Sequence, residues 1–164
     1  MSEPHDESTQ RIFDSVTAAG MTVPSLYRAL ANAPRLLKGW TQFAWSLRFG
    51  ASTPRELREF TILRVAFKSG SQYEWRHHEA MAREIGIAPA VIDVARDSGG
   101  MGILSPQEQA CMRLADDMIE LPKVSDTTSA LCRAQFTDAE YVELVVTVAF
   151  YVCVAKVVSA LELD

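Results

Sequence analysis

The sequence predicts an all-α fold, and three observations support this prediction. Apolar residues recur every three or four positions along most of the chain, which is the period of an amphipathic helix. Segments beginning at Thr53, Ser105 and Thr137 each place a glutamate three residues after a hydroxyl residue, the pattern of a capping box at a helix start. No segment combines period-two alternation with the turn residues that bound a strand.

The length and composition predict one domain. The chain has 164 residues, of which 48% are apolar and 23% charged, enough for one substantial core and too few for two. Residues 1–9 are polar and lack periodicity, so we expect a disordered tail there and a single domain over 10–164.

Five helices are expected in the first half of the chain. Gly20 ends the first helix, and Pro34 ends the second and suits the first turn of the third. Thr53 is expected to cap the fourth helix, which stops near Gly70, and Gly86 ends the fifth. The expected ranges are 12–19, 25–33, 34–49, 53–68 and 71–85.

Four further helices are expected in the second half. Pro89 suits the first turn of a short helix, and the capping signatures at Ser105 and Thr137 begin two longer ones. The expected ranges are 88–95, 105–119, 125–134 and 137–161.

The segments that begin at Thr53 and Thr137 resemble each other. They align without gaps over eight residues, so that Glu59 corresponds to Glu143, and both continue into apolar helices. Two similar helical halves packed face to face would explain this, and so would the general likeness of capped amphipathic helices.

The charge balance excludes several classes of partner. With 16 basic and 21 acidic side chains the formal charge is −5, and no block of five or more like charges occurs, so we expect no nucleic-acid and no membrane partner. The acidic N-terminus lacks the features of a signal peptide, which favours a cytoplasmic location. The longest uncharged apolar run, Leu144 to Ala155, is shorter than the roughly 20 residues that span a bilayer.

The three cysteines predict no disulfide framework and no metal site. Cys111, Cys132 and Cys153 are odd in number and form no ligand pattern with histidines. We interpret them as reduced thiols, mostly buried, without a chemical role.

The candidate chemistry lies between Lys68 and Ala82. On a helix Ser71, Glu74 and His78 share one face. An antiparallel helix pair turning at Ser69-Gly70 would fold Glu59 back toward them. A carboxylate that orients a histidine beside a second carboxylate can transfer protons near neutral pH.

Other readings of these residues stay open. His78 can be a hydrogen-bonded core histidine, and Trp75 can be a core residue or a stacking surface for substrate. Arg64 can pair with Glu59 or hold an anionic substrate. The spacing of Glu59, Glu74 and His78 matches no common metal motif, so no metal is expected.

Most of the chain resembles the carboxymuconolactone decarboxylase family, which includes the alkylhydroperoxidase D proteins. The likeness lies in LANAPRLLKGW, RELREFTILRVA, GSQYEWRHHEAMAREIGI and AFYVCVAKVVSALEL. It implies an all-helical bundle of the alkylhydroperoxidase D type that forms a homotrimer or homohexamer, with pockets near the subunit interfaces.

The resemblance also assigns roles. The family glutamate falls on Glu59, its tyrosine on Tyr73 and its histidine on His78, whereas its two cysteines fall on Ser71 and Glu74. Because thiol peroxidase chemistry requires a thiolate and a resolving thiol, the motif cannot support it here.

We therefore expect an enzyme that acts on a small carboxylated or lactone substrate without a cofactor. His78, Glu59, Glu74 and Tyr73 are the expected catalytic residues. Arg64, Ser71 and Trp75 are the expected substrate contacts. Two alternatives stay open: an antioxidant protein that uses a cysteine outside the motif, and a non-catalytic oligomeric binding protein.

Overall fold

The computed structural model describes residues 7–163, apart from the side chain of Ser98. Over this range the chain forms nine α-helices and one 3-10 helix and has no β-strand, which confirms the predicted all-α fold. It divides into two compact units, one running to Gly50 and taking in the residues from Leu161, the other running from Ala51 to Ala160. Whether these form the single expected domain stays a prediction.

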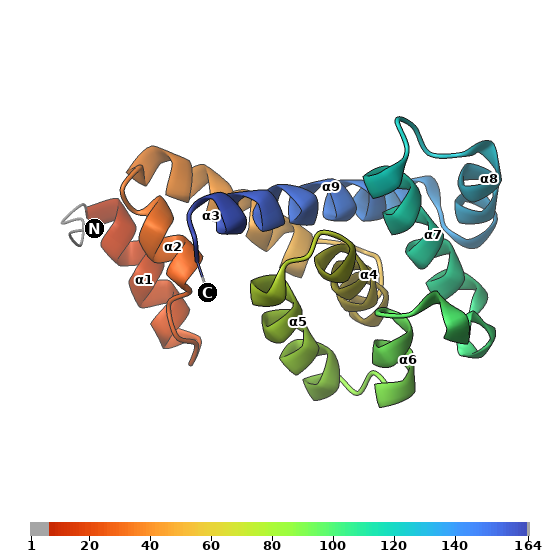
Figure 1. Ribbon diagram of the computed structural model, residues 1–164. Helices are drawn as coiled ribbons and strands as arrows, with labels where there is room; N and C mark the ends of the chain where they lie inside the picture. The colour runs from red at the N-terminus through yellow and green to blue at the C-terminus, as the bar shows by residue number, and fades with distance from the viewer. Residues whose placement is uncertain (1–6, 164) are drawn as a thin grey trace. The chain divides into compact units, whose positions relative to one another are not determined.

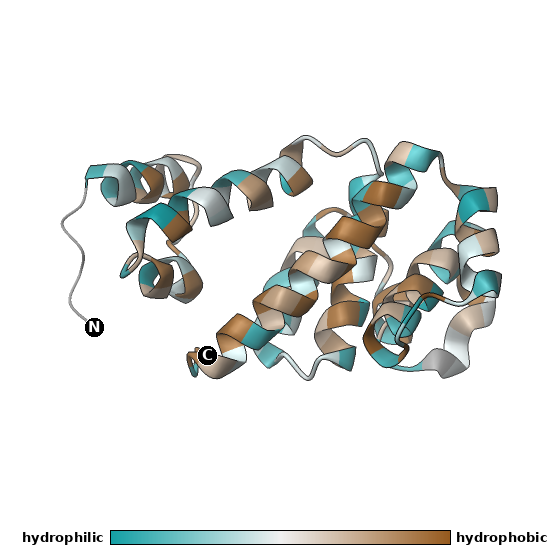
Figure 2. Cartoon of the chain, turned by 90° about the horizontal axis from the view of Figure 1, so that it is seen from above, coloured by the Kyte–Doolittle hydropathy of each residue, from teal (hydrophilic) through white to brown (hydrophobic). Residues whose placement is uncertain are grey.

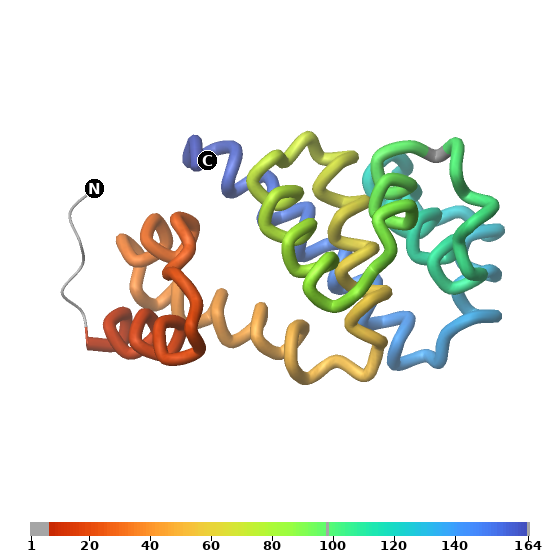
Figure 3. The backbone as a smooth tube through the Cα atoms, turned by 90° about the horizontal axis from the view of Figure 1, so that it is seen from below, coloured from red at the N-terminus to blue at the C-terminus, as the bar shows by residue number. Residues whose placement is uncertain are grey.

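The first unit contains three helices, α1 (Glu7–Ala18), α2 (Ser25–Leu30) and α3 (Pro34–Phe49). Helices α1 and α2 both pack against α3 (Figure 3). Helix α1 begins at Glu7, so residues 7–9, which were expected in the tail, are helical, and the other six residues of the expected tail lie outside the described range. The buried apolar residues of this unit are Val16, Val23, Leu26, Leu30, Ala31 and Leu37.

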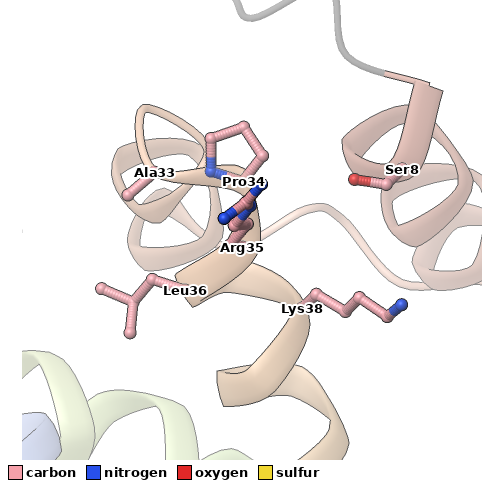
Figure 4. Close-up of a pocket in the computed structure, with 6 residues that line it drawn as sticks. All are labelled: Ser8, Ala33, Pro34, Arg35, Leu36 and Lys38. Atoms are coloured by element: carbon pink, nitrogen blue, oxygen red, sulfur yellow. The ribbon is translucent and has the colours of Figure 1, made fainter.

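A surface hollow of about 770 Å³ lies on this first unit (Figure 4). Ser8 of α1 and the start of α3 line it. None of the predicted catalytic or substrate-binding residues lines this hollow. The residues of α3 and its N-cap that line it are Ala33, Pro34, Arg35, Leu36 and Lys38.

The second unit is built around α4 (Arg55–Lys68), in which every residue from Leu57 to Ala66 is buried. Helices α5, α7 and α9 pack against it (Figure 1). The bounds of the other elements are α5 (Gln72–Glu84), α6 (Pro89–Val94), η1 (Ser98–Ile103), α7 (Pro106–Glu120), α8 (Asp126–Gln135) and α9 (Asp138–Ala160).

Two of the three predicted capping boxes form. Ser105 and Glu108 bind each other's backbone N–H groups at the start of α7. At the start of α9, Glu140 accepts a bond from the backbone N–H of Thr137 at 2.9 Å, and its own N–H donates to the Thr137 hydroxyl at 3.3 Å. The predicted start positions of these helices are therefore confirmed.

The predicted cap of α4 at Thr53 is wrong, because the Thr53 hydroxyl donates to a distant carboxylate and does not bind the first turn of the helix. The residue before the helix is Pro54, which has no side-chain cap. Glu143 of α9 instead accepts four hydrogen bonds, from the backbone N–H and hydroxyl of Ser52 at 2.9 and 3.0 Å and from those of Thr53 at 2.8 and 2.6 Å. This carboxylate ties α9 to the start of the central helix.

The surroundings of Glu143 favour its charged form. Partial burial raises the pKa of its carboxyl, but the hydrogen bonds from Thr53 and Ser52 lower it more, to about 2. The hydrogen bonds of Glu143 to Ser52 and Thr53, which we call the Glu143 clamp, therefore persist at neutral and mildly acid pH.

Among the described helices, one is long and apolar enough to cross a membrane, judged by length and composition alone, and this helix is α9. The uncharged run noted in the sequence is thus part of a 23-residue helix. Within the second unit α9 packs on α4 and α7, as a core helix does, although only 39% of its most apolar window is buried. Figure 2 shows hydrophobic residues along its whole length.

We predict that Glu143→Gln lowers the free energy of unfolding by roughly 1–3 kcal/mol, because the amide nitrogen would face donors that need an acceptor. In the wild type, stability contributed by the depressed pKa is present above pH 4.5 and is lost as the pH falls toward 2. Urea unfolding between pH 7 and pH 3.5 measures both effects.

Glu56→Gln is the matched control, since Glu56 is an exposed glutamate in the first turn of α4. It should change stability by less than about 0.5 kcal/mol. Equal stabilities of the two variants would contradict a structural role for the Glu143 clamp.

Candidate active site

The candidate site lies where α4 and α5 form a helical hairpin. Gly70, in the turn, has a φ of +68°, a conformation that glycine adopts without strain. Ser71 then caps α5 by accepting a hydrogen bond from the backbone N–H of Glu74 at 3.3 Å. This short turn brings the buried face of α5 against α4, as the sequence predicts.

Two carboxylates flank one imidazole inside the hairpin. The Nδ1 atom of His78 lies 2.7 Å from Oε2 of Glu59, and its Nε2 atom lies 3.4 Å from Oε2 of Glu74. All three residues are 5% exposed or less. The predicted contact of Glu59 with His78 is therefore present, and Glu74 completes a buried triad with them.

The triad favours a protonated histidine. Burial lowers the pKa of His78, but the hydrogen bonds to Glu59 and Glu74 and the charges of these carboxylates raise it more, to about 8. A group with this pKa can donate a proton near neutral pH and take it back from solvent.

A tyrosine from the last helix completes the surroundings of His78. The ring of Tyr151 meets the imidazole edge to face, with the ring centroids 4.9 Å apart. The ring of His77 also lies edge to face with His78, at 5.4 Å. Sequence reasoning missed Tyr151, because it lies 73 positions beyond His78 and no local motif marks it.

Two arginines of the first turn of α4 lie close to the triad. The Nε atom of Arg55 is 3.6 Å from Oε1 of Glu59, and its side chain is 43% exposed. Arg58 is largely buried, and this burial lowers the pKa of its guanidinium, while Glu59 and Glu143 oppose that shift. Arg55 is thus a cation that touches both the triad and solvent.

Arg64, the expected substrate cation, is bound to other groups. Its Nε and one terminal nitrogen donate to the two oxygens of Asp116 at 2.6 and 2.9 Å, and the other terminal nitrogen donates to the carbonyl of Ala95 at 3.1 Å. The predicted pairing with Glu59 is replaced by this buried bidentate pair. Because Arg64 follows Glu59 by five residues, it projects from a different face of α4.

Trp75 is a core residue in this structure. It is 4% exposed, donates to Glu79 at 2.8 Å, and carries the guanidinium of Arg96 over its ring at 4.2 Å. Tyr73 is half-buried, and no hydrogen bond or ring contact joins it to His78 among the described residues. The tyrosine beside the imidazole is thus Tyr151.

The buried thiols are poor nucleophiles. Burial raises the pKa of Cys111 to about 12 and that of Cys132 to about 11. Cys153 is exposed on α9. The described residues contain no group of three or more His, Cys, Asp or Glu side chains arranged to hold a metal.

The all-helical fold is of the alkylhydroperoxidase D type. The family model for the carboxymuconolactone decarboxylase family matches residues 34–117, about half of the chain and the part that contains the triad. This protein belongs to that family. No curated protein matches the sequence.

Solved structures of low sequence identity share the fold. An uncharacterized peroxidase-related protein from Silicibacter sp. TM1040 is 20% identical, with a TM-score of 0.85 over 97% of this chain and 85% of that one. The alkylhydroperoxidase AhpD core of an uncharacterized peroxidase-related protein from Ralstonia eutropha JMP134 is 20% identical, with a TM-score of 0.80 over 96% and 84%. A protein of unknown function from Agrobacterium tumefaciens, described as a candidate antioxidant defence protein AhpD, is 15% identical, with a TM-score of 0.77 over 83% and 94%.

We predict that His78 makes stability depend on pH. Its pKa is raised from 6.5 to about 8, so the stabilisation is fully present below pH 6.5 and is lost as the pH rises through 8. Between pH 6 and pH 9 the wild type should lose about 2 kcal/mol more unfolding free energy than His78→Gln. Urea unfolding at pH 6, 7, 8 and 9 measures this difference.

His77→Gln is the matched control, because His77 is the exposed neighbour of His78 on the same helix. It should retain the pH dependence of the wild type. If His78→Gln shows the same dependence as well, the charged triad does not exist in solution.

Proposed function

We propose that this protein is an enzyme that performs general acid/base catalysis on a small carboxylated or lactone-like substrate. The observation that carries the proposal is the buried triad, in which both nitrogens of His78 lie beside carboxylates. Glu59 holds Nδ1 at the shorter distance and orients the ring, so Nε2 is the nitrogen that delivers the proton. The longer 3.4 Å contact of Nε2 with Glu74 is the one that a substrate atom displaces.

Decarboxylation of a lactone acid fits these groups. The bond between the substrate carbon and its carboxylate breaks, carbon dioxide leaves, and the electron pair moves into the conjugated lactone carbonyl. The protonated Nε2 of His78 then donates its proton to the resulting enolate at carbon, and the imidazole recovers a proton from water. The electron pair stays within the substrate throughout, so the step requires no redox cofactor.

Arg55 is the cation that we assign to the substrate carboxylate. It lies 3.6 Å from Glu59 and is half-exposed, whereas Arg64 is occupied by Asp116. A guanidinium at the edge of a buried acid/base triad binds an anionic substrate without adding an uncompensated charge to the core.

The thiol alternative loses most of its support. Ser71 and Glu74 stand at the positions of the family cysteines, and the raised pKa values of Cys111 and Cys132 leave little thiolate at neutral pH. The alternative of a non-catalytic binding protein can be tested directly, because such a protein would turn over no substrate.

We predict that the protein releases carbon dioxide from a carboxylated muconolactone and that His78→Gln lowers kcat/KM by at least about 100-fold, the usual contribution of a general acid. Turnover should fall as the pH rises above about 8, since the imidazolium loses its proton there. Carbon dioxide release across a panel of carboxylated lactones, from pH 6 to pH 9, measures both quantities.

Arg55→Gln should raise KM far more than it lowers kcat, because it removes carboxylate binding, and His77→Gln should leave both constants near those of the wild type. The proposal fails if no lactone acid is turned over, or if His78→Gln retains the activity of the wild type while remaining folded.

A further inference from the structure

Glu74 has no step of its own in the decarboxylation proposed above, although it lies beside the nitrogen that delivers the proton. Its Oε2 atom is 3.4 Å from Nε2 of His78, and the two residues lie one helical turn apart on α5. Nδ1 of the same ring is held by Glu59 at 2.7 Å. The free end of the imidazole therefore carries a proton donor and a proton acceptor side by side.

A donor beside an acceptor suits a reaction in which the substrate loses one proton and gains another. Decarboxylation requires only the donor, because carbon dioxide leaves without a proton and needs no base. Removal of a proton from the same substrate carbon leaves the same electron pair, which again moves into the lactone carbonyl. A lactone that has hydrogen in place of carboxylate at this carbon thus reaches the same enolate when Glu74 acts as the base.

We propose that the triad also isomerises α,β-unsaturated lactones that carry an acid side chain, by moving their double bond one position. Glu74 takes a proton from the ring carbon next to the ring oxygen, and the electron pair moves through the double bond into the carbonyl. Nε2 of His78 then donates its proton to the carbon next to the carbonyl. The inference rests on the proposed function, because it uses the same acid and the same cation, Arg55, for the side-chain carboxylate.

The contact between the two groups closes the cycle. Once the product has left, the proton on Glu74 passes to Nε2 of His78 across the 3.4 Å contact, and both groups return to their starting state. No electron is gained or lost, and no net proton is taken from water. Decarboxylation differs in this respect, since each turnover consumes one proton from solvent.

Burial of the pair favours transfer of the proton from one substrate molecule to the next. Glu74 is 4% exposed and His78 is 5% exposed, and the ring of Tyr151 lies against the imidazole with the centroids 4.9 Å apart. A site that excludes water limits the leakage of protons to solvent. The proton taken from one molecule should therefore appear in the product of another, whereas a single base would return it to the molecule it came from.

The first test follows deuterium in the wild type and so does not depend on the folding of a variant. The probe is an α,β-unsaturated five-membered lactone with an acetate side chain, deuterated at the ring carbon next to the ring oxygen. It is mixed with the same lactone labelled with carbon-13 and free of deuterium. Mass spectrometry at low conversion should find deuterium in the carbon-13 product. Deuterium that stays in its original molecule, or is lost entirely to water, would overturn the proposal.

The second test separates the two reactions by substitution. Glu74→Gln should lower kcat/KM for isomerisation at least about 100-fold, the contribution of a general base, and at least about tenfold more than it lowers carbon dioxide release. Glu84→Gln is the matched control, because Glu84 is an exposed glutamate on the same helix, and it should retain both activities. Equal losses of the two activities in Glu74→Gln, with the helices retained by circular dichroism, would contradict a base at this position.

The two proposals fail in different ways. Carbon dioxide release without isomerisation of the matching lactone would overturn this inference and leave the decarboxylation in place. Isomerisation without carbon dioxide release would support this inference and overturn the decarboxylation. A protein that catalyses neither reaction would overturn both.

Discussion

The buried hydrogen bond between Glu59 and His78 is the interaction on which the candidate site depends. Its two partners come from different helices and are each about 95% buried, so neither can be satisfied by water if the other is removed. A buried ion pair contributes little net stability compared with apolar residues, but breaking one leaves an uncompensated charge that costs several kcal/mol. The pair therefore fixes how α4 and α5 face each other more than it stabilises the fold, and such a cost is consistent with a functional role.

The other buried polar contacts of α4 act in the same way at different positions along the helix. Glu143 of α9 binds the residues that precede it, and Arg64 binds Asp116 of α7. Helices α5, α7 and α9 are thus each attached to α4, or to the residues just before it, by at least one ionised group. Glu59 and Glu143 occupy corresponding positions in the two similar segments that begin at Thr53 and Thr137, but they bind different groups. Glu59 binds an imidazole, whereas Glu143 binds backbone N–H and hydroxyl groups. Only the first of the two segments is followed by a histidine on the next helix, and this difference separates the structural contacts of Glu143 from the proton transfer that we propose for Glu59 and His78.

The features that could be predicted from the sequence are those that depend on residues close together in the chain. Helical periodicity and hydroxyl–glutamate pairs determine where helices occur, and a hairpin with a one-glycine turn suffices to bring Glu59 to His78. The contacts it did not predict join residues far apart in the chain, such as Glu143 with Thr53 and Tyr151 with His78. Arg64 illustrates the limit most clearly. Its position on α4 is evident from the sequence, but its partner Asp116 lies 52 residues later and could be found only from the packing of α7.

Helix α9 has two sides that differ in what they contact within the second unit. Its inner face carries Tyr151 against His78, and its outer face carries the apolar stripe between Asp138 and Lys156. The hydrogen bonds of the triad are complete within one chain, so the pH dependence of stability should be a property of the single chain. Replacing His78 removes a contact on the inner face of α9 and leaves its outer face unchanged. A helix that is apolar on every side is normally buried on every side, whereas within the second unit only 39% of the most apolar window of α9 is buried.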